Sequence, residues 1–415
     1  MVVVAQLGAR MHYAVPAILA RANMLERLYT DTYAPRAIRS VLKGASRLGP
    51  ASLRRWLGRV PADIPEDKIV SFGGMGLEYY WRQRSVESAK SPIAAHLWVG
   101  EEFCRRIISR GLGNADSVYT YNTAGLELLQ YARARGVFAV TEQTIAPGII
   151  QEELLETEAA AHPQWEIPRA VDPLRHAIHE RERQEWEASD LIVCGSEFVR
   201  DGIRAVGGPV DKCCVVPYGI RPPAKLMAKE SCHKPLRVLT VGAVGLRKGT
   251  PYVFAAARSL KGKATFRMVG SLDITPQAQG LLRADVSLLG AVPRSEIHQQ
   301  FAWADVFLLP SICEGSATVC YEALAYGLPV ITTPNAGSVV RDGVDGFIVP
   351  IRDSEAIVDR IERLADNEDL WAAMSQSAVK RASEHTLDKY GERLISALKS
   401  VSQRTCEPDI VHVHE

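Results

Sequence analysis

The sequence predicts an α/β protein built from two doubly wound domains. Short apolar runs rich in Val, Ile and Leu alternate with amphipathic helix candidates, a pattern typical of parallel strands covered by helices. Residues 221–235 (RPPAKLMAKESCHKP) interrupt this alternation with prolines, lysines and few large apolar side chains, which is the composition of a linker. The 415 residues are enough for two domains of roughly 150 to 200 residues, each with its own core.

Buried strand candidates lie on both sides of this linker. Their residues are 2–7, 117–121, 138–141 and 191–194 before it, and 236–244, 266–270, 286–289, 306–309, 330–333 and 347–349 after it. Doubly wound domains bind ligands beyond the carboxyl ends of their strands. We therefore expect a functional site in the cleft between the two domains.

The composition is that of an ordinary soluble protein. Hydrophobic residues make up 47% of the chain and the formal net charge is +1, which argues against a nucleic-acid partner. No run of about 18 apolar residues could span a membrane, and the start MVVVAQLGAR reads as a buried strand rather than a signal peptide. The eight cysteines lack the spacing of a zinc site or a disulfide framework, so we expect a reducing cytoplasm and neither metal nor cofactor.

Two glutamates, Glu314 and Glu322, have seven residues between them in the segment 313–333, CEGSATVCYEALAYGLPVITT. The segment joins two apolar runs, and residues 317–326 suit a helix that the following glycine would end. Glu314 then falls in the loop between strand and helix. Glu322 falls in the helix, one turn after Thr318 and on the same face.

The expected start of that helix offers groups that suit an anion. The amides of Ser316, Ala317 and Thr318, which follow Gly315, precede the first helical hydrogen bonds at the positive end of the helix dipole. Carboxylates bind sugar hydroxyls and amides bind phosphate, so the segment indicates a nucleotide-sugar site. The alternative is that the two glutamates are ordinary charges, one on a surface loop and one paired with a cation.

The first apolar run after the linker ends in a loop flanked by glycines, GLRKGT at 245–250, before a helix expected from Pro251. Arg247 and Lys248 in this loop would form a clamp for a diphosphate. The lysine precedes its glycine, unlike a Walker loop, and the glycines do not fit the dinucleotide pattern G-x-G-x-x-G. Alternatively, the two cations only cap a solvated turn.

Several of these runs together resemble the donor domain of retaining, family 4 type glycosyltransferases of the GT-B fold. The runs are VGAVGLRKGTPYVFAAA, FRMVG, VSLLGAVPRSEIHQQFAWADVFLLPSICEGSATVCYEALAYGLPVITT and PNAGSVVRDGVDGFIVP, all within residues 236–350. Weaker similarities at GARMHYAVP, at residues 189–196 and at PYGI extend the resemblance to almost the whole chain.

The resemblance implies two Rossmann-like domains, an acceptor-binding domain at 1–222 and a donor-binding domain at 223–384. A C-terminal helix at 385–404 would complete the first domain. Glu314 would bind sugar hydroxyls, and Arg247 and Lys248 would neutralise the diphosphate in place of a metal ion. The donor-binding residues that the resemblance implies are Glu322 at the ribose, Gly315, Ser316, Ala317, Thr318, Val292 beside the base, Gly245 and Gly8.

Two positions depart from the family pattern. Many relatives carry an arginine where this chain has Ala243, so the diphosphate clamp must rely on Arg247 and Lys248. Many also carry a histidine after a central strand of the acceptor domain, where this chain reads TEQTIAP. In that run Glu142 is a candidate catalytic base if it faces the cleft, and otherwise it is structural. His12 is a second candidate, or else a packed neutral histidine.

Residues 35–61 contain no acidic side chain but carry seven cations. These cations are Arg36, Arg39, Lys43, Arg47, Arg54, Arg55 and Arg59. Interleaved apolar residues give the stretch a basic face and an apolar face in helical projection. This pattern favours contact with an anionic membrane surface, to which each cation contributes about 1 kcal/mol. The alternative is a helical hairpin on its own domain, with arginines facing solvent or a phosphorylated acceptor.

These patterns predict a retaining, metal-independent hexosyltransferase that moves a sugar from a nucleoside diphosphate sugar to a saccharide or lipid-linked acceptor. Bacterial-type polysaccharide or glycolipid assembly is the expected setting, in the cytoplasm or at the inner face of the membrane. A hydrolase that uses the two glutamates as acid and base, a GT-B sugar-nucleotide epimerase and a non-catalytic nucleotide-sugar-binding protein are the alternatives. The tail at 407–415 supports no assignment.

Overall fold

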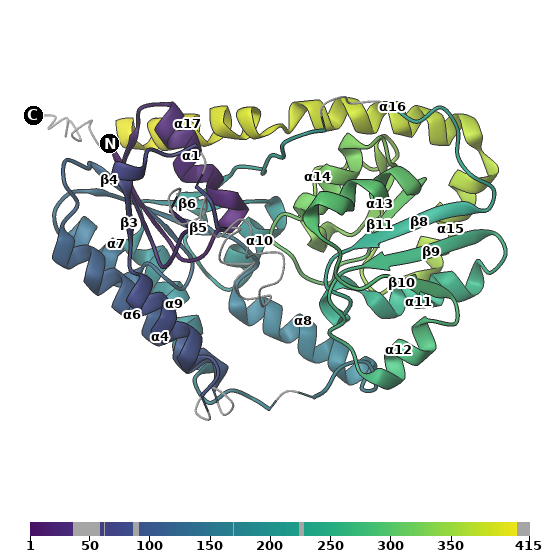
Figure 1. Cartoon of the computed structure of the whole chain (residues 1–415), viewed down its shortest axis with the longest axis horizontal. Helices are drawn as coiled ribbons and strands as arrows, with labels where there is room; N and C mark the ends of the chain where they lie inside the picture. The colour runs from purple at the N-terminus through teal and green to yellow at the C-terminus, as the bar shows by residue number, and fades with distance from the viewer. Residues whose placement is uncertain (36–58, 62, 86–90, 169, 224–227, 405–415) are drawn as a thin grey trace, which may run out of the picture.

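The computed structural model describes residues 1–35, 59–61, 63–85, 91–168, 170–223 and 228–404 (Figure 1). Its architecture is two parallel sheets, covered by helices, that lie side by side. The predicted α/β class with two doubly wound sheets is therefore confirmed. The basic stretch at 35–61 lies almost wholly outside the described residues, as does the tail at 407–415.

The N-terminal sheet has seven strands in the order β3-β2-β1-β4-β5-β6-β7. Its strands are β1 (Val2–Gln6), β2 (Leu25–Thr30), β3 (Ile69–Ser71), β4 (Ser117–Tyr121), β5 (Phe138–Gln143), β6 (Leu191–Cys194) and β7 (Cys213–Val215). Chain order reverses between β1 and β4, so the loops after these strands diverge and leave room beyond their carboxyl ends.

The second sheet has six strands in the order β10-β9-β8-β11-β12-β13. Its strands are β8 (Leu236–Val241), β9 (Ala264–Val269), β10 (Val286–Leu288), β11 (Val306–Leu309), β12 (Val330–Thr332) and β13 (Gly346–Ile348). Here the order reverses between β8 and β11, the two strands that lead into the loops singled out by sequence. Both loops therefore start from neighbouring strand ends.

Helices cover both faces of each sheet (Figure 1). Around the first sheet they are α1 (Ala14–Arg21), α4 (Gly73–Arg82), α6 (Pro92–Arg110), α7 (Leu126–Arg133), α8 (Gly148–Ala161), α9 (Arg175–Ala188) and α10 (Glu197–Ala205). The later ones are α11 (Thr250–Ser259), α12 (Pro276–Leu282), α13 (Ile297–Trp303), α14 (Thr318–Ala325), α15 (Ser354–Asp366), α16 (Glu368–Glu384) and α17 (Leu387–Arg404).

Every predicted strand is present, with ends shifted by a few residues, but the prediction missed three strands. In β2 (LERLYT) the half-buried Glu26 and Arg27 interrupt the apolar run. The other two, β3 and β7, are only three residues long and lie at opposite edges of the sheet. Edge strands pair on one side only and need fewer apolar residues, which explains why an apolar-run criterion does not detect them.

The C-terminal helix α17 returns to the first sheet and packs against α1 (Figure 1). Gly391 makes the close approach possible, because a Cβ there would lie 3.1 Å from Ile18. Leu394 and Tyr390 of α17 are fully buried in a hydrophobic core that also contains Leu324 of α14. Burying a leucine side chain of this kind stabilises the fold by about 1.5 to 3 kcal/mol.

Helix α8 and the segment after it connect the first half to the second. Glu158 of α8 is fully buried, accepts a hydrogen bond from the Tyr252 hydroxyl at 2.9 Å and forms an ion pair with Arg352. Trp165 is 3% exposed and belongs to the core of the six-stranded sheet. Its carbonyl oxygen accepts a hydrogen bond from the amide of Thr275.

Candidate functional site

The loop after β8 bends through a 3₁₀ turn, η5 (Leu246–Lys248), into α11. Gly249 ends the turn with φ of +70°, and a Cβ at this position would overlap the carbonyl oxygen of Pro310. Both features require glycine at this position. Lys248 is only 9% exposed, so its ammonium group is held close to the strand ends.

Glu314, in the loop between β11 and α14, binds both predicted clamp cations. Its Oε1 atom lies 2.7 Å from Nη1 of Arg247 and 2.7 Å from Nζ of Lys248. The Glu314 side chain is 12% exposed, so water screens these ion pairs only partly. The structure thus brings together the three residues that sequence analysis placed at the sugar and the diphosphate.

The Glu314 loop also contacts the N-terminal half. A Cβ on Gly315 would overlap the carbonyl oxygen of Thr144, in the loop after β5. The Ser196 hydroxyl, at the start of α10, donates a hydrogen bond to the carbonyl oxygen of Gly315. A Cβ added to Gly195 would lie 3.0 Å from the Cβ of Ser316. No side chain larger than that of glycine fits at position 315, because the two halves of the molecule are in contact there.

The amides at the start of α14 are only partly available. The amide of Ala317 donates a hydrogen bond of 3.0 Å to the carbonyl oxygen of Ala336, so the expectation of three free amides is wrong at this residue. The amides of Ser316 and Thr318 donate to no other group in the part of the chain that the structure describes. Ser316 also pairs its hydroxyl with that of Tyr321 at 2.7 Å.

Glu322 projects from α14 toward a residue that sequence analysis did not single out. Its Oε1 atom lies 3.3 Å from Nη2 of Arg294, and the other terminal nitrogen of Arg294, Nη1, lies 2.7 Å from Nε2 of His12. Burial raises the pKa of Glu322, and the nearby charge of Arg294 partly opposes this effect. Arg294 follows the end of β10, and a cation after a strand end was the sequence signal that could have identified it.

The remaining predicted donor-binding residues lie around these groups. Gly8 has φ of +72° and donates its amide hydrogen to Oδ1 of Asp31 at 2.9 Å. Gly245 has an extended backbone, and a Cβ there would lie 2.7 Å from Oε1 of Glu166. Val292 is half-buried and packs against the shared core.

Glu142 does not face a solvent-filled cleft in this structure. It is 1% exposed, and its two carboxylate oxygens accept hydrogen bonds from Tyr119 at 2.5 Å and from Tyr218 at 2.6 Å. Burial raises its pKa, and the two hydroxyl groups oppose that shift. The condition for a catalytic Glu142, exposure to the acceptor, is thus not met, and the arrangement favours the structural alternative.

Arg10, in the loop after β1, is a further residue near Gly315 that the sequence patterns did not single out. Its Nη1 atom donates a hydrogen bond of 3.0 Å to the Thr144 hydroxyl, beside the contact with Gly315, and its guanidinium group lies over the ring of Tyr121. No group of three or more His, Cys, Asp or Glu side chains within the described ranges is placed to bind a metal ion.

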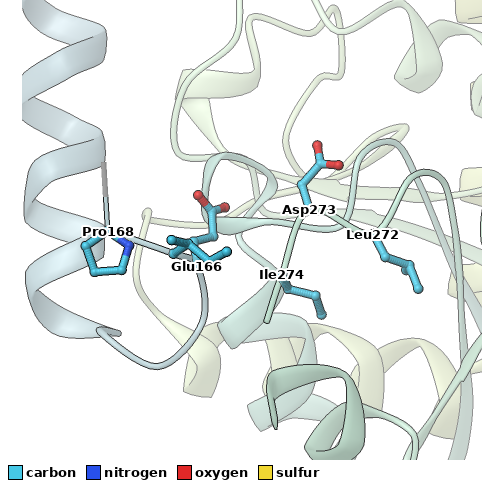
Figure 2. Close-up of a pocket in the computed structure, with 6 residues that line it drawn as sticks. Glu166, Pro168, Leu272, Asp273 and Ile274 are labelled. Atoms are coloured by element: carbon cyan, nitrogen blue, oxygen red, sulfur yellow. The ribbon is translucent and has the colours of Figure 1, made fainter. Parts of the chain in front are cut away.

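A separate pocket has a volume of about 380 Å³ (Figure 2). Glu166 and Pro168 line one side and Leu272, Asp273 and Ile274 the other. Glu166 is tied to the loop after β8, because its Oε1 atom accepts a hydrogen bond of 2.6 Å from the Leu246 amide. None of the predicted site residues lines this pocket.

Comparison with known proteins gives a family match and relatives for this chain. Residues 235–367 match the family model described as "Glycosyl transferases group 1". An amylovoran biosynthesis glycosyltransferase from Erwinia amylovora is 28% identical over 242 residues, which cover 53% of this chain and 60% of that protein. The match thus spans less than two thirds of that relative's length.

Solved structures share the fold over nearly the whole chain. A sucrose-phosphate synthase from Thermosynechococcus elongatus has a TM-score of 0.67 at 15% identity and covers 97% of this chain and 99% of its own. HepE from Anabaena, in complex with UDP and glucose, has a TM-score of 0.60 at 14% identity, with coverage of 96% and 99%. Residues 235–367 are therefore a region that matches the glycosyl transferases group 1 model, and the fold of the chain is GT-B.

Proposed function

We propose that the protein is a retaining glycosyltransferase that transfers a hexose from a nucleoside diphosphate sugar to a saccharide or lipid-linked acceptor in polysaccharide assembly. The observation that carries the proposal is the convergence of Arg247, Lys248 and Glu314 where β8 and β11 end. Cations suit a diphosphate and a carboxylate suits sugar hydroxyls. The family match at residues 235–367 and the polysaccharide role in the relative's name support it.

The chemistry follows from where negative charge develops. The bond between the anomeric carbon and the diphosphate oxygen breaks, and its electron pair stays on the leaving oxygen. The acceptor oxygen bonds to the same carbon, and its proton passes to the leaving diphosphate. Arg247 and Lys248 stabilise the leaving group, and the free amides of Ser316 and Thr318 can add to this stabilisation. These groups supply the charge that a divalent metal would otherwise provide, so we propose activity that persists in excess chelator.

Lys248→Ala provides the sharpest test. The ammonium contact strengthens as the leaving group gains charge. We therefore expect Lys248→Ala to raise the activation barrier by about 2 to 4 kcal/mol, which lowers turnover roughly 30- to 1,000-fold. Lys261→Ala is the matched control, because Lys261 is an exposed lysine in the same half. Steady-state rates with a panel of nucleotide sugars measure both variants. A Lys248→Ala rate within about threefold of wild type would exclude the clamp role.

Two alternatives are separated by the same assay. An epimerase would convert the sugar nucleotide without any acceptor, because it keeps the leaving group and the sugar together in the cleft. A binding protein would show donor-dependent stabilisation without turnover, since bound ligand adds RT ln(1 + [L]/Kd) to the free energy of unfolding. Acceptor-dependent release of nucleoside diphosphate is expected only for the transferase.

We also propose that the protein works at the inner face of a membrane, with residues 35–61 as the contact. Six cations of this stretch support the proposal, whereas the seventh, Arg59, forms an ion pair of 2.6 Å with Asp31. No helix among the described residues is long and apolar enough to cross a bilayer. Electrostatic attachment weakens as the Debye length falls from about 10 Å at 0.1 M salt to about 3 Å at 1 M. Co-sedimentation with anionic and neutral liposomes at both salt levels is the measurement, and equal binding to both would contradict the proposal.

A further inference from the structure

Arg294 connects the two halves of the molecule at the proposed ribose site. It begins the 3₁₀ turn η6 (Arg294–Glu296) after β10. One terminal nitrogen contacts Oε1 of Glu322 in its own half, and the other contacts Nε2 of His12 in the loop after β1. The Arg294 side chain is 71% exposed, whereas that of Glu322 is 28% exposed. Arg294 is thus held mainly by these two contacts and lies largely in water.

The contact with His12 requires a neutral imidazole. A guanidinium group can only donate hydrogen bonds, so Nε2 of His12 must accept, and the ring proton must be on Nδ1. Burial lowers the pKa of His12, and the charges of Arg294 and Arg221 lower it further. His12 is therefore an acceptor for Arg294 at neutral pH.

The backbone around His12 supports a functional role for this contact. Met11, His12 and Tyr13 have φ values of +43°, +53° and +62°, three successive residues in a region that side chains rarely adopt. Buried Gln6 holds the loop by donating from Nε2 to the carbonyl oxygens of Gly8 and Arg10, at 3.0 and 3.3 Å. Strain of this kind persists where surrounding structure enforces it, commonly at ligand sites and switches.

We propose that Arg294 is a gate for the donor nucleotide: it occupies the Glu322 carboxylate while the site is empty and leaves it when ribose hydroxyls bind there. This inference rests on the proposed function, which assigns Glu322 to the ribose. The carboxylate oxygen that accepts from Arg294 is an acceptor that ribose hydroxyls need, so the two compete. Release of Arg294 also breaks its hydrogen bond to His12, and nucleotide binding thereby loosens the contact between the two halves.

Nucleoside diphosphate binding to Arg294→Gln tests the gate. Removing a mostly exposed competing cation should tighten the Kd for the best ligand among UDP, GDP and ADP by about two- to fivefold, measured by calorimetry at pH 7.5. Arg283→Gln is the matched control, because Arg283 is exposed at the end of α12 and should leave the Kd unchanged. In a Glu322→Gln background, Arg294→Gln should improve the Kd by less, since a neutral amide holds Arg294 without an ion pair.

The outcomes separate the gate from the function on which it rests. Weaker or unchanged binding by Arg294→Gln, with wild-type binding intact, overturns the gate and leaves the proposed function standing. An equal gain in the Glu322→Gln background also overturns it, because Arg294 would then act elsewhere. If none of the three nucleotides binds wild type or any variant, the proposed function fails and the gate fails with it.

Discussion

Glu314 pairs with both clamp cations through one carboxylate oxygen, which leaves a net charge of +1 on the three groups. In the proposed function, an incoming diphosphate would compete with the carboxylate for Arg247 and Lys248, while the sugar hydroxyls would compete with the cations for Glu314. Each charged group therefore exchanges one partner for another when a donor binds. Such an exchange keeps each of the three charges paired. A desolvated charge without a partner costs much more free energy than the loss of an exposed ion pair.

The two glutamates should differ in which ligands they affect. We expect Glu322→Ala to weaken both nucleoside diphosphate and intact donor by about tenfold or more, because hydrogen bonds to a charged group contribute about 1.5 to 3 kcal/mol. Glu314→Ala should weaken only the intact donor, since its partner is the sugar and its loss frees both cations for the diphosphate. Calorimetric titration of both variants with both ligands measures this. Equal losses in all four titrations would contradict the assignment.

The elements around the site followed from local patterns, and the contacts between elements did not. The helix α14 and the clamp loop were predictable because apolar period, glycine position and Pro251 are local signals. The carbonyl that binds the Ala317 amide lies in the later turn η7 (Pro334–Ala336), and the tyrosines that enclose Glu142 come from β4 and from the segment after β7. Such pairings depend on tertiary packing, which a single sequence does not show.

The loop between β11 and α14 also depends on tertiary packing, through Gly315. We expect Gly315→Ala to lower turnover at least tenfold, because its Cβ would overlap the carbonyl oxygen of Thr144 and displace the adjacent Glu314. Overpacking of this kind also costs about 1 to 3 kcal/mol of stability. Gly280→Ala in α12 is the control, since a Cβ there meets nothing within 4 Å. Similar rates for the two variants would show that the loop tolerates displacement.

At the scale of the whole molecule, the described residues join the two halves at several places besides the contact of Arg294 with His12. The helix α17 from the C-terminal end packs on α1, α8 and Trp165 pack on the six-stranded half, and Gly315 meets Thr144 between them (Figure 1). The proposed gate at Arg294 opens only one contact between the halves and leaves these three intact. Donor binding is therefore expected to rearrange loops at the cleft without separating the halves.

The buried ion pair between Glu158 and Arg352 should contribute to the stability of the whole chain rather than of one half. Arg352→Ala leaves the fully buried Glu158 without its cation, so we expect a loss of about 2 to 4 kcal/mol, slightly below the usual 3 to 5 because Arg352 is 33% exposed. Urea unfolding followed by tryptophan fluorescence measures the loss, with Arg283→Ala as the exposed control. Replacing both partners by leucine should recover most of it, because no unpaired charge then remains. If the free energy of unfolding falls by less than about 0.5 kcal/mol, as for an exposed arginine, this ion pair does not stabilise the packing of α8 on the second half.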